Sequence, residues 1–272
     1  MDGRKLSILV IGAHPDDAEI QAGGVSILYA GQGHKVRFVS VTNGDAGHHE
    51  MQGETLARRR AGEAGRAGAL AGIGYEILGN PDGELEPTIE NRRRLIRLIR
   101  RSAADLIFTH RPDDYHPDHR YTSVLVQDAV FMTTIPNICP DTPRLTASPV
   151  VMYLRDVFQS RTPFRPVVAV GIDAVIAKKM DMLDCHVSQM YEFLPYILGY
   201  RDEVPKGEKE RRAWLETKWL PCSSADPWRD LLLQLYGEPG GRKIRYAEAF
   251  EPSDYGTPLN DGNLRTLFPF FS

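Results

Sequence analysis

The sequence has few cysteines, and their positions exclude two classes of site. Cys139, Cys185 and Cys222 are the three cysteines of the 272-residue chain, and no two of them form a Cys-x-x-Cys pair. Such wide spacing argues against a disulfide framework and against a zinc site built from thiolates. A metal ion bound to this chain would therefore need histidine and carboxylate ligands.

The chain also lacks a strong net charge and a long apolar run. The formal net charge is −3, which gives no overall attraction for nucleic acid or for an anionic membrane surface. No apolar run approaches the roughly 20 residues of a membrane-spanning helix. The apolar stretch at 6–11 is also too short for a secretory signal peptide. We therefore expect a cytoplasmic protein with no stable membrane insertion and no nucleic-acid partner.

A dinucleotide-binding loop is missing too. Gly12 and the pair Gly23-Gly24 do not form a G-x-G-x-x-G fingerprint, and acids stand where a pyrophosphate would lie. This argues against a nucleotide-dependent oxidoreductase. Gly23 and Gly24 are better explained by close packing of a helix against a sheet.

What the sequence does contain is a regular alternation of strand-like and helix-like segments over its first 110 residues. Short apolar runs predict strands, and the longer segments between them predict helices. The predicted strands lie at 7–11, 35–41, 75–78 and 106–109, and the predicted helices at 18–30, 55–70 and 88–101. This rhythm is typical of an α/β protein with a Rossmann-like three-layer α/β/α fold and a mostly parallel sheet in a 3-2-1-4-5 type order.

The pattern is looser in the second half of the chain. Further strands are expected at 150–154 and 167–170, and a helix at 173–186 with Asp173 as its N-cap. We interpret the chain as one domain over 1–272, with a core at about 6–190 and an irregular C-terminal extension at about 200–272. The aromatic residues of this extension favour a homo-oligomer.

Two tetrads carry most of the chemical information. Residues 14–17 read His-Pro-Asp-Asp and follow the first predicted strand, and residues 116–119 read His-Pro-Asp-His and come after the fourth. Either tetrad alone is compatible with a simple turn or a helix cap. In a 3-2-1-4-5 sheet, however, strands one and four are neighbours, and ligands bind beyond their carboxyl ends. Together the tetrads therefore predict one metal-dependent site.

The tetrads offer four strong metal ligands, which are His14, Asp17, His116 and His119. The two ligands of each tetrad are three residues apart, so both can face one point. A catalytic Zn²⁺ typically has three protein ligands and an open position. One histidine of the second tetrad should therefore be free for acid or electrostatic work, and the spacing leaves open which one. Asp16 beside the ligands suits a general base, and Asp118 suits the orientation of a neighbouring imidazole.

Three other features have simpler interpretations. His48 and His49 are expected in a solvated loop. The arginine-rich segment 91–101 has apolar residues at helical spacing, so its arginines should form the wet face of a helix. His186 is expected to be a core residue or a helix-end cation.

With these residues in place, the chain resembles the LmbE-like or PIG-L zinc-dependent de-N-acetylases. The resemblance rests mainly on 13–17 (Ala-His-Pro-Asp-Asp) and on the second tetrad, and it extends over about 6–250. Weaker matches are Thr42-Asn43-Gly44, Arg60 with Glu63, Asp82-Gly83, Asp113-Asp114-Tyr115, 186–189 and 247–250.

The resemblance implies a role for each residue of the tetrads. The zinc ligands would be His14, Asp17 and His119, with another divalent transition metal as an alternative to Zn²⁺. Asp16 would be the general base, and His116, oriented by Asp118, would stabilise the oxyanion or protonate the leaving amine. Some family members have a tyrosine two positions before that histidine, where this chain has Asp114. One of Arg58, Arg59 and Arg60 would contact the substrate.

The implied activity is hydrolysis of a linear amide, with removal of the acetyl group from an N-acetylglucosamine-type sugar or glycoconjugate. Two alternatives remain: an amidase that acts on another sugar-linked conjugate, and a non-catalytic metal- or sugar-binding protein. The second alternative does not account for Asp16, His116 and Asp118, which binding alone would not require. The loops at 43–54 and 133–165 and the C-terminal extension are expected to determine specificity.

Overall fold

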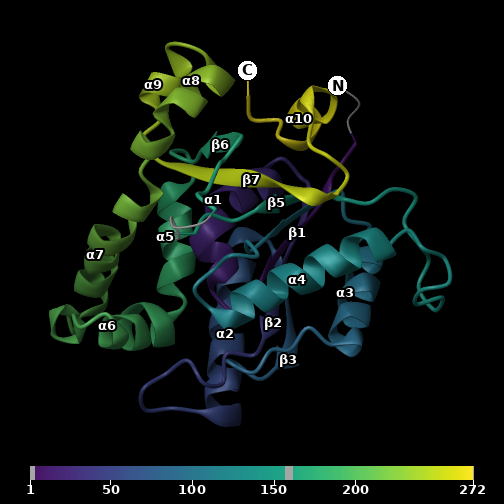
Figure 1. Ribbon diagram of the computed structural model, residues 1–272. Coiled ribbons are helices and arrows are strands. Elements are labelled where there is room, and N and C mark those ends of the chain that lie inside the picture. Colours follow the sequence, from purple (N-terminus) through teal and green to yellow (C-terminus); the bar gives the residue numbers. More distant parts are fainter. Residues whose placement is uncertain (1–3, 157–161, 272) are drawn as a thin grey trace.

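The computed structural model describes residues 4–156 and 162–271 and contains a seven-stranded, mostly parallel sheet between helices (Figure 1). The strand order is β3-β2-β1-β4-β5-β7-β6, which confirms the predicted 3-2-1-4-5 order and extends it. The strands are β1 (Ser7–Gly12), β2 (Lys35–Thr42), β3 (Gly74–Asn80), β4 (Leu106–Thr109), β5 (Val150–Tyr153), β6 (Val168–Gly171) and β7 (Ala247–Gly256). Residues 157–161, part of a loop expected to determine specificity, lie outside the described residues.

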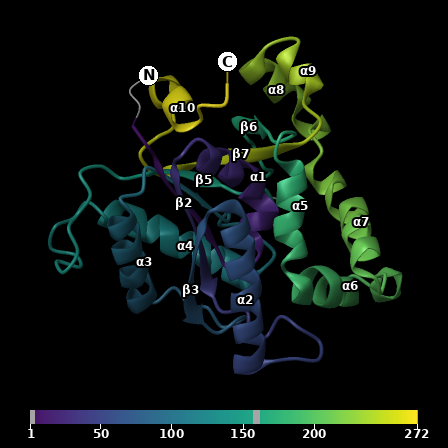
Figure 2. The same ribbon diagram turned by 180° about the vertical axis from the view of Figure 1, so that it is seen from behind.

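Helices cover both faces of the sheet, as the two opposite views show (Figures 1 and 2). The first five are α1 (Asp17–Gly31), α2 (Gly53–Ala71), α3 (Ile89–Ser102), α4 (Pro117–Met132) and α5 (Ile176–Asp184). Because side chains alternate along a strand, β1 contributes to two separate cores. Ile8 and Val10 pack with residues of α1 and α2, whereas Leu9 and Ile11 pack with residues of α3 and α4.

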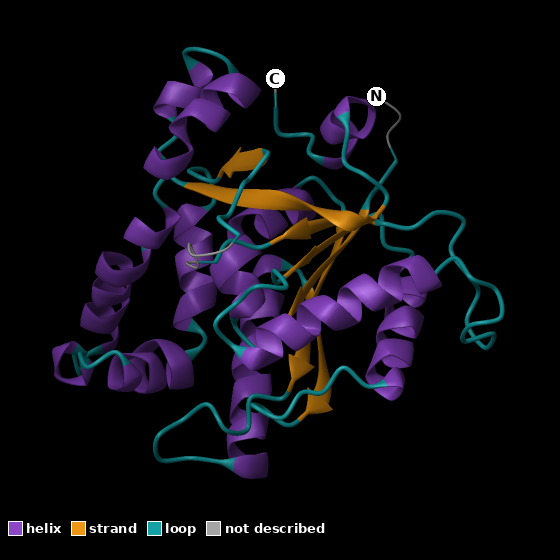
Figure 3. Ribbon diagram, viewed as in Figure 1, coloured by secondary structure: helices purple, strands orange, loops and turns teal. Residues whose placement is uncertain are grey.

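The C-terminal region adds helices and one strand that the sequence pattern missed. The helices are the π-helix Ser188–Phe193, α6 (Leu194–Ile197), α7 (Glu208–Trp219), α8 (Arg229–Tyr236), α9 (Gly240–Lys243) and α10 (Asp261–Leu267). Strand β7 runs antiparallel to both of its neighbours, β5 and β6, and is the long arrow near the top of Figure 3. Within the described ranges, no helix combines the length and the apolar character that crossing a membrane requires.

One predicted helix boundary was wrong. Helix α5 begins at Ile176, and Asp173 does not cap it. The Asp173 carboxylate instead accepts hydrogen bonds from the backbone amides of Arg245 and Tyr246, just before β7. The residue therefore joins two distant segments of the chain.

The arginines of α3 do not all lie on its wet face. Arg92 and Arg97 pair with acids at the surface, as predicted, but Arg100 is only 4% exposed. Its guanidinium donates to the backbone carbonyls of Met132, Thr133, Ile135, Ile138, Cys139 and Thr142. Arg100 thus organises the end of α4 and the loop after it.

The hydrogen bonds of Arg100 predict that its replacement lowers the stability of the protein and leaves the site residues in place. Arg100→Met should lower the free energy of unfolding by about 3 kcal/mol, because buried carbonyls lose their donor and unsatisfied polar groups cost roughly 1–3 kcal/mol each. Urea unfolding followed by tryptophan fluorescence measures the change. A variant as stable as the native chain would show that water or other donors replace Arg100.

Candidate functional site

The two tetrads meet at the carboxyl ends of β1 and β4. These strands pair in parallel with Ile11 opposite Thr109, so the loops that follow them begin side by side. The first loop leads into α1 at Asp17, and the second leads into α4, where His116 is the N-cap residue. A side chain at Gly12 would place its Cβ 2.7 Å from the Cβ of Asp17, so glycine allows α1 to start against the strand.

Donor atoms of three tetrad residues lie close together around one point, which we call the convergence point. The Nδ1 atom of His14 lies 3.2 Å from the Nε2 atom of His119 and 3.5 Å from the Oδ2 atom of Asp17. The Oδ1 atom of Asp17 lies 3.5 Å from His119 Nε2. Tetrahedral ligands at about 2.0–2.1 Å from a zinc ion would be roughly 3.3–3.4 Å apart. The spacing of the two imidazole nitrogens fits such an ion, and the carboxylate of Asp17 lies 3.5 Å from each of them through a different oxygen.

Carboxylates hold the outer side of the His14 ring. Its Nε2 atom is 3.1 Å from an oxygen of Asp82 and 3.3 Å from an oxygen of Asp118. Burial alone would lower the pKa of His14, but Asp118, Asp17 and Asp82 outweigh burial and raise that pKa well above its usual value. The inner Nδ1 atom is thereby directed toward the convergence point.

The carboxylate of Asp118 does not orient His116, contrary to the expectation from the sequence. It faces His14 and also accepts hydrogen bonds from the amides of Gly83 and Leu85. Only the backbone amide of Asp118 contacts His116, by donating to its Nδ1 atom at 3.2 Å. The physical reason is that the loop after β3 passes over the first turn of α4, where its backbone amides and the His14 ring occupy the Asp118 carboxylate.

His119 is oriented by Asp114, a residue to which the sequence motifs gave no role in the site. Its Nδ1 atom lies 3.0 Å from Asp114, which leaves Nε2 directed toward Asp17 and His14. The ring of His110 stacks on that of His119 at 3.8 Å. The Ala13 amide donates to His110 Nε2, so this nitrogen already has a backbone partner. Asp82 follows β3 and Asp114 follows β4. Their positions beyond the carboxyl ends of strands could have identified them as site residues from the sequence.

Asp16 is a buried carboxyl group beside the convergence point. Burial raises its pKa to about 6, Arg60 opposes this shift, and Asp17 adds to it. Its backbone has φ 153° and ψ −21°, which is unusual for a residue with a side chain. Such outliers persist where the surrounding structure enforces them, often at functional sites.

Arg60 is the arginine of its cluster that reaches the site. Its Nη2 atom is 3.3 Å from Asp16 Oδ1, and its Nη1 atom is 3.5 Å from Asp82. Arg59 instead forms two hydrogen bonds with Glu192, and Arg58 pairs with Glu54 at the surface. Of the three arginines that the sequence offered, Arg60 lines the cavity described below.

His116 lies next to the ring of His14 at 4.5 Å between centroids, in an edge-to-face arrangement. Burial lowers its pKa, and His14 and His119 lower it further. Because its Nδ1 atom accepts a hydrogen bond, a neutral His116 carries its proton on Nε2. The side chain can therefore act as a hydrogen-bond donor.

Several overlapping groups of side chains could hold a metal ion. Among the described residues these include His14 with His116 and His119, His14 with Asp82, His116 and Asp118, and Asp17 with His110 and His119. The set of His14, Asp17 and His119 has one advantage over them. Each of its imidazoles has a carboxylate on the nitrogen that faces away from the convergence point. Such outer partners are typical of histidines that ligate metals.

A cavity of about 780 Å³ opens above these groups. One part of its lining, here called the floor, is polar and includes Arg60 and five tetrad residues: His14, Asp16, Asp17, His116 and His119. Its wall is apolar and consists of Phe193, Leu194, Ile197, Leu198 and Trp219. The wall comes from the π-helix, α6 and α7, so the C-terminal half of the chain contributes to the site.

Three histidines considered from the sequence, His48, His49 and His186, do not line the cavity. His48 is hydrogen-bonded to Glu192, and His49 stacks between His48 and Tyr196. Their side chains are 2% and 5% exposed, so the expectation of a solvated loop was wrong. His186 is fully buried and lies 2.9 Å from Glu19, which agrees with a core role.

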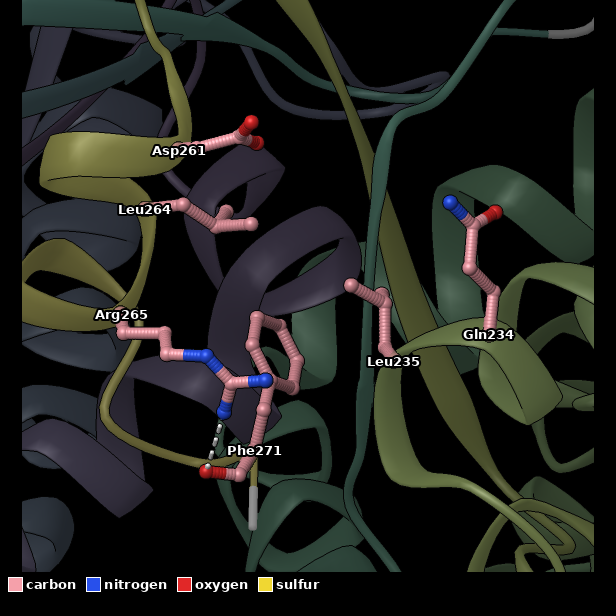
Figure 4. Close-up of a pocket in the computed structure, with 6 residues that line it drawn as sticks. All are labelled: Gln234, Leu235, Asp261, Leu264, Arg265 and Phe271. Atoms are coloured by element: carbon pink, nitrogen blue, oxygen red, sulfur yellow. Dashed lines mark hydrogen bonds between the residues drawn. The ribbon is translucent and has the colours of Figure 1, made fainter.

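A second cavity, of about 260 Å³, lies between α8 and α10 (Figure 4). It is lined by Gln234, Leu235, Asp261, Leu264, Arg265 and Phe271. Helix α10 contacts the end of α1 far from Asp17, through the hydrogen bond from Tyr29 to the Leu267 carbonyl. This cavity is therefore remote from the tetrads.

The chain is similar in sequence to several enzymes. Residues 9–130 match the PIG-L family, described as GlcNAc-PI de-N-acetylase. Diacetylchitobiose deacetylase of Thermococcus kodakarensis is 32% identical over 138 residues, which cover 48% of this chain and 51% of that protein. The match thus spans about half the length of that relative.

Two further similarities are broader and weaker. 4-Oxalmesaconate hydratase of Pseudomonas putida is 26% identical over 197 residues, or 70% of this chain and 76% of that protein. The solved structure of N,N'-diacetylchitobiose deacetylase from Pyrococcus horikoshii has a TM-score of 0.67 at 24% identity. It covers 90% of this chain and 83% of that chain, which shows a shared α/β fold.

The geometry predicts different metal affinities for two neighbouring variants. His119→Ala should weaken Zn²⁺ binding by more than about 100-fold, beyond the roughly 10–100-fold typical for loss of an outer partner. His116→Ala should change it by less than about 10-fold. A competition titration against a fluorescent chelator measures both. The opposite pattern would show that His116 is the ligand.

Proposed function

We propose that the chain is a zinc-dependent de-N-acetylase that acts on an N-acetylated amino sugar or its conjugate, and the match of residues 9–130 to the PIG-L family supports this proposal. The observation that carries this proposal is the convergence of His14, Asp17 and His119 within 3.5 Å of one another. Asp16 and His116 line the same cavity although metal binding does not require them. These two additional groups favour catalysis over simple binding.

In this proposal His14, Asp17 and His119 hold the ion. A bound Zn²⁺ supplies Lewis acidity toward an amide carbonyl and toward water, and another divalent transition metal would suit the same ligands. Asp114 and Asp118 keep the two imidazoles oriented through their outer nitrogens.

Asp16 takes the proton from the attacking water in this scheme. Its pKa of about 6 suits a group that accepts a proton and later releases it near neutral pH. Arg60 anchors Oδ1 of this carboxylate at 3.3 Å and thereby orients it. Arg60 is thus assigned to the positioning of the base.

His116 supplies a hydrogen-bond donor in the same scheme. Its Nε2–H would stabilise the oxyanion that forms from the amide carbonyl or protonate the leaving amine. The lowered pKa of His116 favours the neutral imidazole, which suits donation to the oxyanion. Protonation of the leaving amine would require the imidazolium, formed after His116 takes up a proton, for example the one that Asp16 accepts from water. The Asp118 amide at Nδ1, not the Asp118 carboxylate, is what selects the tautomer.

The composition of the cavity supports a neutral substrate. Its lining includes five carboxyl groups, on Asp16, Asp17, Asp82, Asp114 and Asp156, and two guanidinium groups, on Arg60 and Arg155. With a divalent ion bound, five carboxylates (−5), two guanidinium groups (+2) and the ion (+2) sum to −1, so a neutral acetamide suits the lining better than a polycarboxylate does. The apolar wall suits an apolar face or substituent of the sugar.

Hydration of an unsaturated acid is a second candidate, favoured by the similarity to 4-oxalmesaconate hydratase over 70% of this chain. The same floor could activate water for addition to a carbon–carbon double bond. The excess of carboxyl groups in the cavity makes this candidate the weaker one.

The assignment of the base predicts separate effects on chemistry and on metal binding. Asp16→Asn should keep the bound ion but lower kcat by about 10²- to 10⁴-fold, the typical contribution of a general base. Asp128→Asn, which removes a surface carboxylate paired with Arg92, is the matched control. If Asp16→Asn kept full activity, the assignment of the base would be wrong.

A substrate panel distinguishes the two candidate reactions. Free N-acetylglucosamine, its oligomers, and lipid- and thiol-linked glycosides should be tested for amine release, and 4-oxalmesaconate for loss of ultraviolet absorbance. We expect amine release from at least one sugar and no hydration. Hydration without amine release would favour the second candidate.

A further inference from the structure

Helix α1 is interrupted just behind the site. Ala22 has φ −139° and ψ 15°, outside the helical region. In a regular helix the Gly24 amide would donate to the Ile20 carbonyl, four residues earlier. Here the Gly24 amide donates to Glu248 Oε1 at 2.8 Å, and the Ile20 carbonyl accepts a hydrogen bond from Lys179 Nζ at 2.8 Å.

A buried ion pair takes the place of that helical hydrogen bond. Lys179 on α5 and Glu248 on β7 are 3% and 5% exposed, and their charged groups are 2.8 Å apart. Glu248 also accepts the Val25 amide at 2.7 Å. The chain of contacts therefore runs from the Ile20 carbonyl through Lys179 and Glu248 to the amides beyond the break.

The two glycines at the break make room for this pair. A Cβ at Gly24 would lie 3.0 Å from Glu248 Oε1 and 2.8 Å from two carbons of Ile172. A Cβ at Gly23 would lie 3.5 Å from Cγ of Lys179. The Gly23-Gly24 pair thus serves the approach of α5 and β7 to α1.

The segment ahead of the break belongs to the site. It carries Asp17 of the convergence point, and Ile20 and Gln21 line the cavity. Burying two charged groups costs free energy unless both make enough hydrogen bonds to replace those lost with water. Here Lys179 and Glu248 form hydrogen bonds with backbone groups that lack a helical partner because of the break. Buried backbone groups without a hydrogen-bond partner are rare in folded proteins.

We propose that Lys179 and Glu248 are positioning residues that hold the first turn of α1, and with it Asp17, in the geometry that binds the metal ion. Their effect on the ion rests on the proposed function, whereas their effect on the first turn of α1 does not. Neither residue lines the cavity, so each acts through the helix.

The test compares two buried cations that donate to backbone carbonyls. Lys179→Met in the full chain should weaken Zn²⁺ binding about 10- to 100-fold, as loss of an outer partner does, and should lower kcat more than it changes KM. Lys179→Arg, which keeps a donor and a charge, should restore most of the affinity. Arg100→Met is the matched control and should leave the affinity of the folded protein within about 2-fold, because Arg100 serves α3, α4 and the loop after α4.

Hydrogen exchange gives a readout that is independent of the metal. Lys179→Met should speed amide exchange in residues 17–25 relative to the rest of α1. Glu248→Gln provides the same comparison if Lys179→Met does not fold. Unchanged exchange in this segment would overturn the proposal, as would native Zn²⁺ affinity in the folded variant. If the native chain bound no Zn²⁺, the proposed function would be contradicted. Amide exchange in residues 17–25 would still show whether Lys179 and Glu248 hold the first turn of α1.

Discussion

The parallel pairing of β1 with β4 places Ile11 opposite Thr109, and the site depends on this register. Neighbouring strands are about 4.8 Å apart, so loops a hundred residues apart in sequence start within one strand spacing. The turn into α1 and the turn into α4 then direct His14, Asp17 and His119 toward a common point. A shift of either strand would separate them.

A ring of carboxylates surrounds this point. Asp82 and Asp118 face the outer nitrogen of His14, and Asp114 faces that of His119. The outer nitrogens are therefore engaged, and the inner ones remain available as donors of electron pairs. A cation at the centre would relieve the repulsion among the buried acids.

The strand order and the meeting of the tetrads were predictable from the sequence, because both follow from the alternation of strands and helices. The contact of the Asp118 carboxylate with His14 was not predictable, because it depends on where the loop after β3 passes over α4. Strand β7 was missed because it contains Pro252 and lacks clear alternation, and its partners are distant in sequence. Arg100 and His49 are buried by loops whose paths no local pattern specifies.

The groups that could hold an ion overlap, so the position of the ion is the most direct test of the account. Crystals grown with Zn²⁺ and measured at the zinc absorption edge would locate it by anomalous scattering. We expect a single peak at about 2.0–2.2 Å from donor atoms of His14, Asp17 and His119. A peak bound instead by His116 with Asp82 and Asp118, or by His110 with Asp17, would contradict it.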